Sequence, residues 1–242
     1  MAQSIYPQEL RENAFFSMYA EIAMESFYNA LQRYEEVKSS NYVVSSMWEL
    51  GEMDKHVIST VVFSAMCVES FLNNYAAACL GDSEFYDNFD KLSAIGKFQL
   101  ISKFILKTDI DKEKSYYSLL KQLFKKRDSY VHNKSRKAKY QGVSAEDLEN
   151  YQSGRQDFGE DNQYIEPTFP KKEVDADIRE ARDALKAVKE IALFFDEFDS
   201  EVYAYERLFH PTGVLWGHHA EIRYKSVVFP LLGIKVDKKH EI

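Results

Sequence analysis

Apolar side chains recur every three or four positions along five long segments, and this period is the strongest constraint on the fold. An α-helix turns once in about 3.6 residues, so this spacing gathers the apolar side chains on one face. The chain has only five prolines and nine glycines in 242 residues, so few positions interrupt the pattern. The pattern predicts helices over residues 9–38, 53–80, 91–106, 111–133 and 172–200. We therefore expect an all-α fold, an up-and-down bundle of four to five helices.

Breaks in the pattern predict the organisation of the domain. Gly81 directly follows the second helix, where a helix stop belongs. Serines and a glycine between residues 39 and 54 predict an interruption before that helix. Residues 141–170 are polar, acidic and closed by two prolines, which predicts a loop insertion. We expect one helical domain over residues 1–202 that contains this insertion, and a C-terminal extension over residues 203–242 without an assignment.

Composition favours a soluble protein that stays in the cytoplasm. No uninterrupted apolar run approaches the roughly 18 residues that a membrane helix needs, and the first residues lack the layout of a signal peptide. Cys67 and Cys79 fall in one predicted helix, about 18 Å apart along its axis, which is too far for a disulfide. We expect both to be small buried hydrophobic residues.

One basic segment stands out in an acidic chain. Residues 125–140 hold seven basic residues and one acidic residue, a charge of +6 in a chain whose net charge is −8, so the remainder carries −14. A positive patch on a negative body is either a directed binding surface or a solvated helix end.

Two charged residues fall on the apolar stripes. At about 100° per residue, Arg127 lies close to the line of Tyr116, Leu120, Leu123, Tyr130 and Val131. Glu69 lies close to the stripe of the second helix by the same geometry. An unpaired buried ion costs several kcal/mol, so we expect the two charges to meet, as a structural salt bridge or as the lining of a polar notch within or between subunits.

His132 follows Arg127 by five residues, about 140° around an ideal helix. The two side chains cannot converge on one phosphate within a regular helix. Either the helix ends there, or the pair acts across a symmetry axis with a second copy. Asp128, four residues before His132, is placed to hold one ring nitrogen. A histidine at this place can also serve only as a partner of the helix dipole.

The segment Arg127-Asp128-Ser129-Tyr130-Val131-His132 resembles the signature of the HEPN superfamily, an arginine and a histidine separated by four residues near the end of a late helix. The segments "VVFSAMCVESFLNNYAA" and "DKLSAIGKFQLISKF" are also similar to that family. The resemblance covers residues 9–200. Some regulated members carry a tyrosine two positions after the histidine, where this chain has Lys134.

The resemblance implies a helical bundle that dimerises and brings two copies of the motif into one cleft. It implies a metal-independent endoribonuclease without a cofactor, of a kind found in toxins and anti-phage defence, with an antitoxin or regulatory protein as a further partner. His132 would move the proton of the ribose 2′-hydroxyl, Arg127 would hold the scissile phosphate, Asp128 would orient one of them, and Glu69 would support the site. We expect four basic residues to contact RNA: Lys126, Lys134, Arg136 and Lys137.

Two other interpretations remain open at this point. One is a catalytically silent dimer of the same type that binds a nucleotide or a protein partner. The other is an unrelated helical scaffold in which the motif is a coincidence. The Gly-His-His at residues 217–219 lacks a third ligand at metal-site spacing, so we expect no metal.

Overall fold

The described part of the protein is helical almost throughout. The structure is a computed structural model that describes residues 15–39, 43–132, 171–209 and 221–234. Of these residues 84% are helical and none forms a strand, which confirms the all-α prediction. The main helices are α1 (Phe16–Ser39), α2 (Val43–Leu80), α4 (Ala94–Leu100), α5 (Ser115–Val131), α7 (Lys171–Phe198), α8 (Ala204–Phe209) and α9 (Glu221–Leu232).

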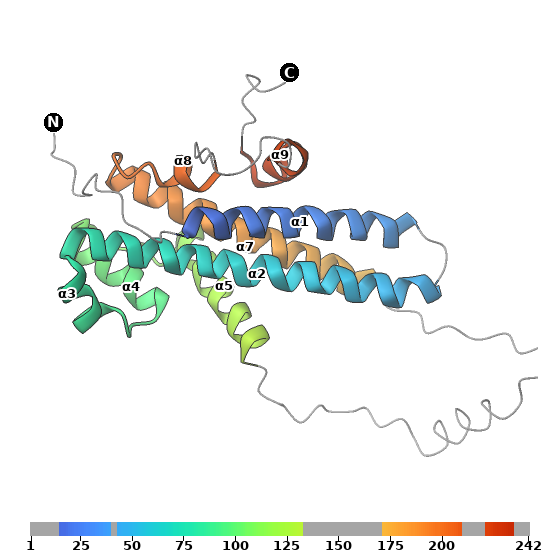
Figure 1. Ribbon diagram of the computed structural model, residues 1–242, viewed down its shortest axis with the longest axis horizontal. Helices are drawn as coiled ribbons and strands as arrows, with labels where there is room; N and C mark the ends of the chain where they lie inside the picture. The colour runs from blue at the N-terminus through green and yellow to red at the C-terminus, as the bar shows by residue number, and fades with distance from the viewer. Residues whose placement is uncertain (1–14, 40–42, 133–170, 210–220, 235–242) are drawn as a thin grey trace, which may run out of the picture.

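α1 and α2 lie side by side as a long antiparallel pair (Figure 1). α2 already begins at Val43 and has 38 residues, so the interruption predicted before residue 54 is wrong over most of its length. Serines and one glycine lower helix propensity by at most about 1 kcal/mol per residue. Packing along a long partner helix supplies more than that, because most helical stability in proteins comes from tertiary contact.

α7 closes the core against this pair. Its predicted stripe is confirmed from Ala181 onward, because Ala181, Leu185, Val188, Ala192 and Phe195 are all buried, whereas Ile178 before them is only partly buried. The ring of Phe195 packs edge-on against two rings of α2, at centroid distances of 4.9 Å to Phe71 and 4.8 Å to Tyr75. Aromatic pairs in this geometry add to the stabilisation from burial alone. α2 and α7 therefore share one aromatic core.

α2 ends as predicted at Leu80, where Gly81 takes a φ of 85° that favours glycine. A short α3 (Asp82–Glu84) and a π-helical segment η1 (Phe85–Phe89) follow. The helix predicted from residue 91 begins instead at Ala94, because the Ser93 hydroxyl accepts the Gly96 N–H as an N-cap. The end of that helix, η2 (Ile101–Ile105), is π-helical.

The described residues after 202, residues 203–209 and 221–234, include two further helices that pack on the bundle. α8 and α9 contact both α1 and α7 (Figure 1). The Asp196 carboxylate accepts the N–H groups of Ala204 and Tyr205 at 2.6 and 2.9 Å, which caps the start of α8. Lys189 donates to the carbonyl oxygen of Leu232 at 2.8 Å, which fixes the end of α9. The extension therefore contributes to the same core.

One segment of α2, Met53–Leu80, is long and apolar enough to cross a membrane by length and composition, although Glu69 interrupts its apolar run. Half of its most apolar window is buried within the protein (50%). Cys67 in this helix is buried and Cys79 is partly buried, and neither forms a disulfide.

Candidate functional site

The motif lies on the last two turns of α5. The predicted line is confirmed at Leu120 and Leu123, which are buried together with Tyr117 and Phe124, while Tyr116 and Tyr130 are only partly buried. Val131 is 52% exposed. The reason is that the C-terminal end of α5 projects from the bundle (Figure 1), so the neighbouring helices cover its last turns only in part.

Arg127 reaches from α5 to α2. Its Nη2 lies 3.8 Å from Oε2 of Glu69, which confirms that the two charges meet. The prediction that both are deeply buried is wrong, because their side chains remain 27% and 34% exposed. A separation of 3.8 Å is beyond hydrogen-bond range, so this is a loose ion pair. The guanidinium also lies over the Phe124 ring, 5.2 Å from its centroid.

The Nε atom of Arg127 is buried and makes no hydrogen bond to any described residue. Oδ1 of Asp128 lies 3.1 Å away, but the N–H does not point at it. Leaving a buried donor unsatisfied costs about 1–3 kcal/mol. Arg127 is therefore held by Glu69, Phe124 and Asp128, and only the exposed part of its side chain, 27%, is accessible to an added anion.

His132 marks the end of the helix. α5 stops at Val131, and His132 adopts non-helical angles (φ −105°, ψ 60°) while its backbone N–H still bonds to the Asp128 carbonyl oxygen at 3.0 Å. Its side chain is exposed. The predicted side-chain contact with Asp128 is not formed, and among the described residues no hydrogen bond or ion pair joins the ring to Arg127. The ring is therefore open to solvent.

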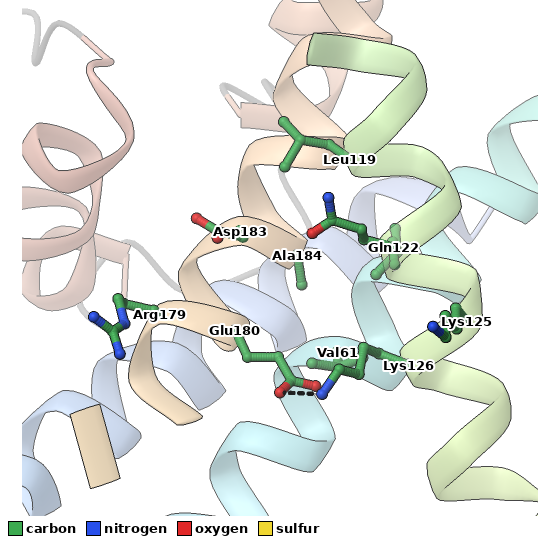
Figure 2. Close-up of a pocket in the computed structure, with 10 residues that line it drawn as sticks. Val61, Leu119, Gln122, Lys125, Lys126, Arg179, Glu180, Asp183 and Ala184 are labelled. Atoms are coloured by element: carbon green, nitrogen blue, oxygen red, sulfur yellow. Dashed lines mark hydrogen bonds and ion pairs between the residues drawn. The ribbon is translucent and has the colours of Figure 1, made fainter. Parts of the chain in front are cut away.

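The other flank of α5 faces α7 across a groove (Figure 2). At one end of this groove Lys126 Nζ lies 2.7 Å from Oε2 of Glu180 on α7. Lys126, which the resemblance assigned to RNA, is thus engaged by a carboxylate within the chain. The Lys126 side chain is nevertheless 50% exposed.

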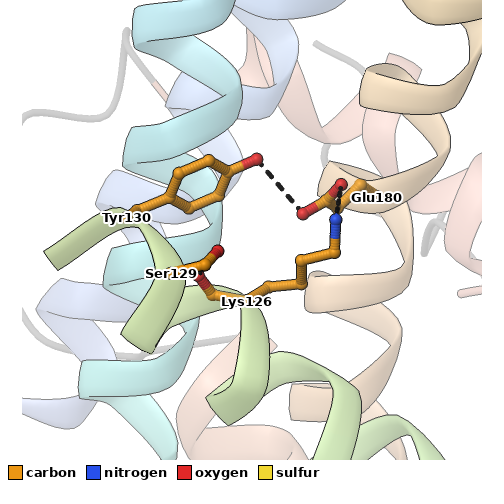
Figure 3. Close-up of polar contacts among 4 residues, drawn as sticks. All are labelled: Lys126, Ser129, Tyr130 and Glu180. Carbon is orange, nitrogen blue, oxygen red and sulfur yellow. Dashed lines mark hydrogen bonds and ion pairs between the residues drawn. The ribbon is translucent and has the colours of Figure 1, made fainter. Parts of the chain in front are cut away.

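Glu180 binds a second residue of α5 as well. The Tyr130 hydroxyl donates to its other oxygen, Oε1, at 3.1 Å (Figure 3). Each carboxylate oxygen therefore accepts one hydrogen bond from α5, and Glu180 itself is only 16% exposed. Lys126, Tyr130 and Glu180 thus form a clasp that links the last turns of α5, which carry the motif, to α7.

Nothing in the sequence pointed to Glu180. The one usable signal was a tyrosine near an apolar line, since a partly buried hydroxyl needs a partner.

The clasp lies in acidic surroundings. Burial, followed by the charge of Glu180 and its hydrogen bond, raises the pKa of Tyr130 well above its ordinary value, and Asp177 and Asp54 add to the shift. Burial also raises the pKa of Asp54. In the described ranges, no group of three or more His, Cys, Asp or Glu side chains could hold a metal ion.

Several predicted features lie outside the described residues. These are Lys134, Arg136 and Lys137, the insertion at residues 141–170, and the Gly-His-His at residues 217–219. They stay predictions.

Comparison with known protein families, with characterised proteins and with solved structures finds no match to this chain. The class that the fold defines is therefore an all-α helical protein, and the assignment of a function rests on the residues at the end of α5.

Proposed function

We propose that this protein is a metal-independent endoribonuclease of HEPN type, which acts as a cytoplasmic homodimer and requires no cofactor. The observation that carries the proposal is the state of Arg127. Its guanidinium is positioned by Glu69, Phe124 and Asp128, while 27% of the side chain stays exposed. The exposed part of the guanidinium would donate charge-assisted hydrogen bonds to a phosphate oxygen.

His132 would act as the general base. It would take the proton of a ribose 2′-hydroxyl while the 2′-oxygen attacks the adjacent phosphorus. The P–O5′ bond breaks, and the departing oxygen takes a proton from the conjugate acid. The products are a 2′,3′-cyclic phosphate and a 5′-hydroxyl. Arg127 would stabilise the charge that builds on the phosphoryl oxygens, and Asp128 would orient Arg127 through its neighbouring carboxylate.

A dimer would bring two copies of Arg127 and His132 into one cleft around a two-fold axis near the end of α5. Within one chain, Arg127 is directed at Glu69 of α2, whereas His132 follows the helix end with non-helical angles and is exposed. Exposed apolar side chains are present for such a contact, since Ile58, Met66 and Val131 are 38%, 36% and 52% exposed. A role as a toxin or in anti-phage defence, with an antitoxin partner, follows only from the resemblance.

Incubation with RNA in the presence of EDTA tests the proposal. Wild-type protein and the Lys121→Ala control should leave 2′,3′-cyclic phosphate ends, and His132→Ala should not. Lys121 is a suitable control because it is exposed on the same helix and away from the motif. Cleavage by His132→Ala at the wild-type rate, or no cleavage by any of the three proteins, would remove the ribonuclease assignment. If sedimentation still showed a dimer in that case, the silent dimer would take its place.

A further inference from the structure

Residues 125–132, the last turns of α5 and its C-cap, carry the motif but have no buried anchor. Phe124 is the last buried side chain of α5, at 5% exposure, and none of residues 125–132 is buried. At a rise of 1.5 Å per residue, His132 lies roughly 12 Å beyond Phe124 along the helix axis. Hydrophobic packing therefore fixes the direction of α5 only as far as Phe124, and the position of the motif depends on other contacts.

The hydrogen bonds of these residues to other helices converge on one side chain. Lys126 and Tyr130 both donate to the carboxylate of Glu180, at 2.7 and 3.1 Å (Figure 3). Among the described residues, no other hydrogen bond joins residues 125–132 to a different helix. The contact between the end of α5 and α7 therefore depends on one acceptor, which is only 16% exposed.

The two donors lie on the same face of α5. Lys126 and Tyr130 are four residues apart, so they are neighbours on the helix surface, one turn from each other. Bonds from successive turns to one carboxylate restrict both the tilt and the rotation of the helix end. This face is turned to α7, and Arg127 is then directed at Glu69 of α2, where the two charges lie 3.8 Å apart.

We propose that Glu180 is a positioning residue for the motif, an inference whose catalytic part rests on the proposed cleavage of RNA. Glu180 contacts no reacting group and acts through Lys126 and Tyr130, which hold the helix end that carries Arg127 and His132. A misplacement of about 1 Å at the reacting groups can lower a rate about 100-fold. Over a length of roughly 12 Å beyond Phe124, a tilt of only about 5° displaces His132 by that amount.

The kinetics of RNA cleavage by substituted proteins test this role. Glu180→Ala should lower kcat at least about tenfold and change KM less than about threefold, because Glu180 does not contact the RNA. Glu180→Gln should keep kcat within about threefold of wild type, since the amide still accepts from Lys126 and donates to the Tyr130 hydroxyl. Glu190→Ala is the matched control and should leave kcat unchanged. Glu190 is also partly buried on α7, and it accepts from Ser115 at the start of α5, at 3.4 Å.

A measurement in a second background shows whether Glu180 acts through its two donors. In a Lys126→Ala/Tyr130→Phe protein both donors are already absent, so adding Glu180→Ala should change kcat by less than about twofold. Circular dichroism will provide the folded fraction by which each kcat is normalised. A further loss of about tenfold in this background would overturn the proposed role, because Glu180 would then act by another route.

Hydrogen exchange of residues 125–132 separates this inference from the ribonuclease assignment. Exchange should be faster in Glu180→Ala than in wild type and in Glu190→Ala, whether or not the protein cleaves RNA. Exchange at the wild-type rate in Glu180→Ala would overturn the positioning role, and faster exchange with unchanged kcat would overturn its importance for catalysis. Faster exchange in a protein whose wild type does not cleave RNA would remove the ribonuclease assignment and retain Glu180 as the residue that positions the motif.

Discussion

The two flanks of α5 hold charged residues in opposite ways. On the α7 flank, Glu180 accepts hydrogen bonds from Lys126 and Tyr130 at 2.7 and 3.1 Å. On the α2 flank, Arg127 lies 3.8 Å from Glu69 and 3.1 Å from Asp128, and neither contact has the geometry of a hydrogen bond. Hydrogen-bonded carboxylates fix structure more firmly than loose ion pairs do. We conclude that the α7 flank anchors α5, whereas the α2 flank holds Arg127 more loosely.

The largest expected difference between the flanks is in RNA cleavage. Arg127→Ala should lower kcat at least about 100-fold, because loss of one donor to a developing oxyanion commonly costs that much. Lys126→Ala should change kcat by less than about threefold, since Lys126 is engaged by Glu180. Single-turnover assays on one RNA substrate provide the measurement. Equal losses in the two variants would contradict the division between the flanks.

For the free energy of unfolding, we expect a substitution on the α7 flank to have a larger effect than one on the α2 flank. Glu180→Ala removes the acceptor of two α5 side chains, and we expect it to lower the free energy of unfolding by about 2 kcal/mol. Glu69→Ala is the matched control on the other flank, and it should cost less than about 1 kcal/mol because its pair is loose and partly exposed. Urea unfolding of both variants provides the comparison. A larger cost for Glu69→Ala would show that the loose pair is the real anchor.

Tyr130→Phe should have a smaller effect, a loss of about 1 kcal/mol in the free energy of unfolding at pH 7. The substitution keeps the ring and removes only the hydroxyl that donates to Glu180. Hydrogen exchange should become faster in the last turns of α5 and stay unchanged in α8. Exchange that is unchanged in both helices would mean that the tyrosine bond does not hold the motif in place.

The smallest expected effect is a change with pH in the difference in unfolding free energy between wild-type protein and Tyr130→Phe. The pKa of Tyr130 is raised in the folded state, so its stabilisation is complete below the ordinary tyrosine value of about 10. As the pH rises above that value, the unfolded state loses the proton first, and wild-type stability falls relative to Tyr130→Phe. The difference between the two proteins should be constant from pH 6 to 9 and should decrease by pH 11. A difference that grows with pH would contradict the direction of the shift.

Sequence periodicity was a good guide wherever a helix is covered by its neighbours. The stripe of α7 from Ala181 to Phe195 is buried as predicted, and Gly81 ends α2. It was a poor guide at the end of α5, where Val131 lies close to the helical line of Leu120 but is 52% exposed. Periodicity shows which side chains share a face, but it does not show how far along the helix a partner covers that face.

The sequence predicted the candidate site only in part, as it did the buried faces of the helices. Two charges on apolar stripes need a partner, and that requirement alone paired Arg127 with Glu69. No such rule selects Glu180, because acidic residues are frequent in this chain and, among those that the structure describes, Glu180 alone binds both Lys126 and Tyr130. The groove between α5 and α7 was also beyond reach from the sequence, since its lining comes from three helices that are distant in the chain.

The sequence by itself determined an all-α protein with a charged motif at the end of a helix, because helical period and the cost of burying charge are local properties. Only the tertiary structure decided that α5 projects from the bundle, with its α7 flank held by hydrogen bonds to Glu180 and its α2 flank in looser contact. The crossing of α5 over α2 and α7 depends on the packing of all three helices together. That crossing brings Glu180 to Lys126 and Tyr130 and places Arg127 at 3.8 Å from Glu69.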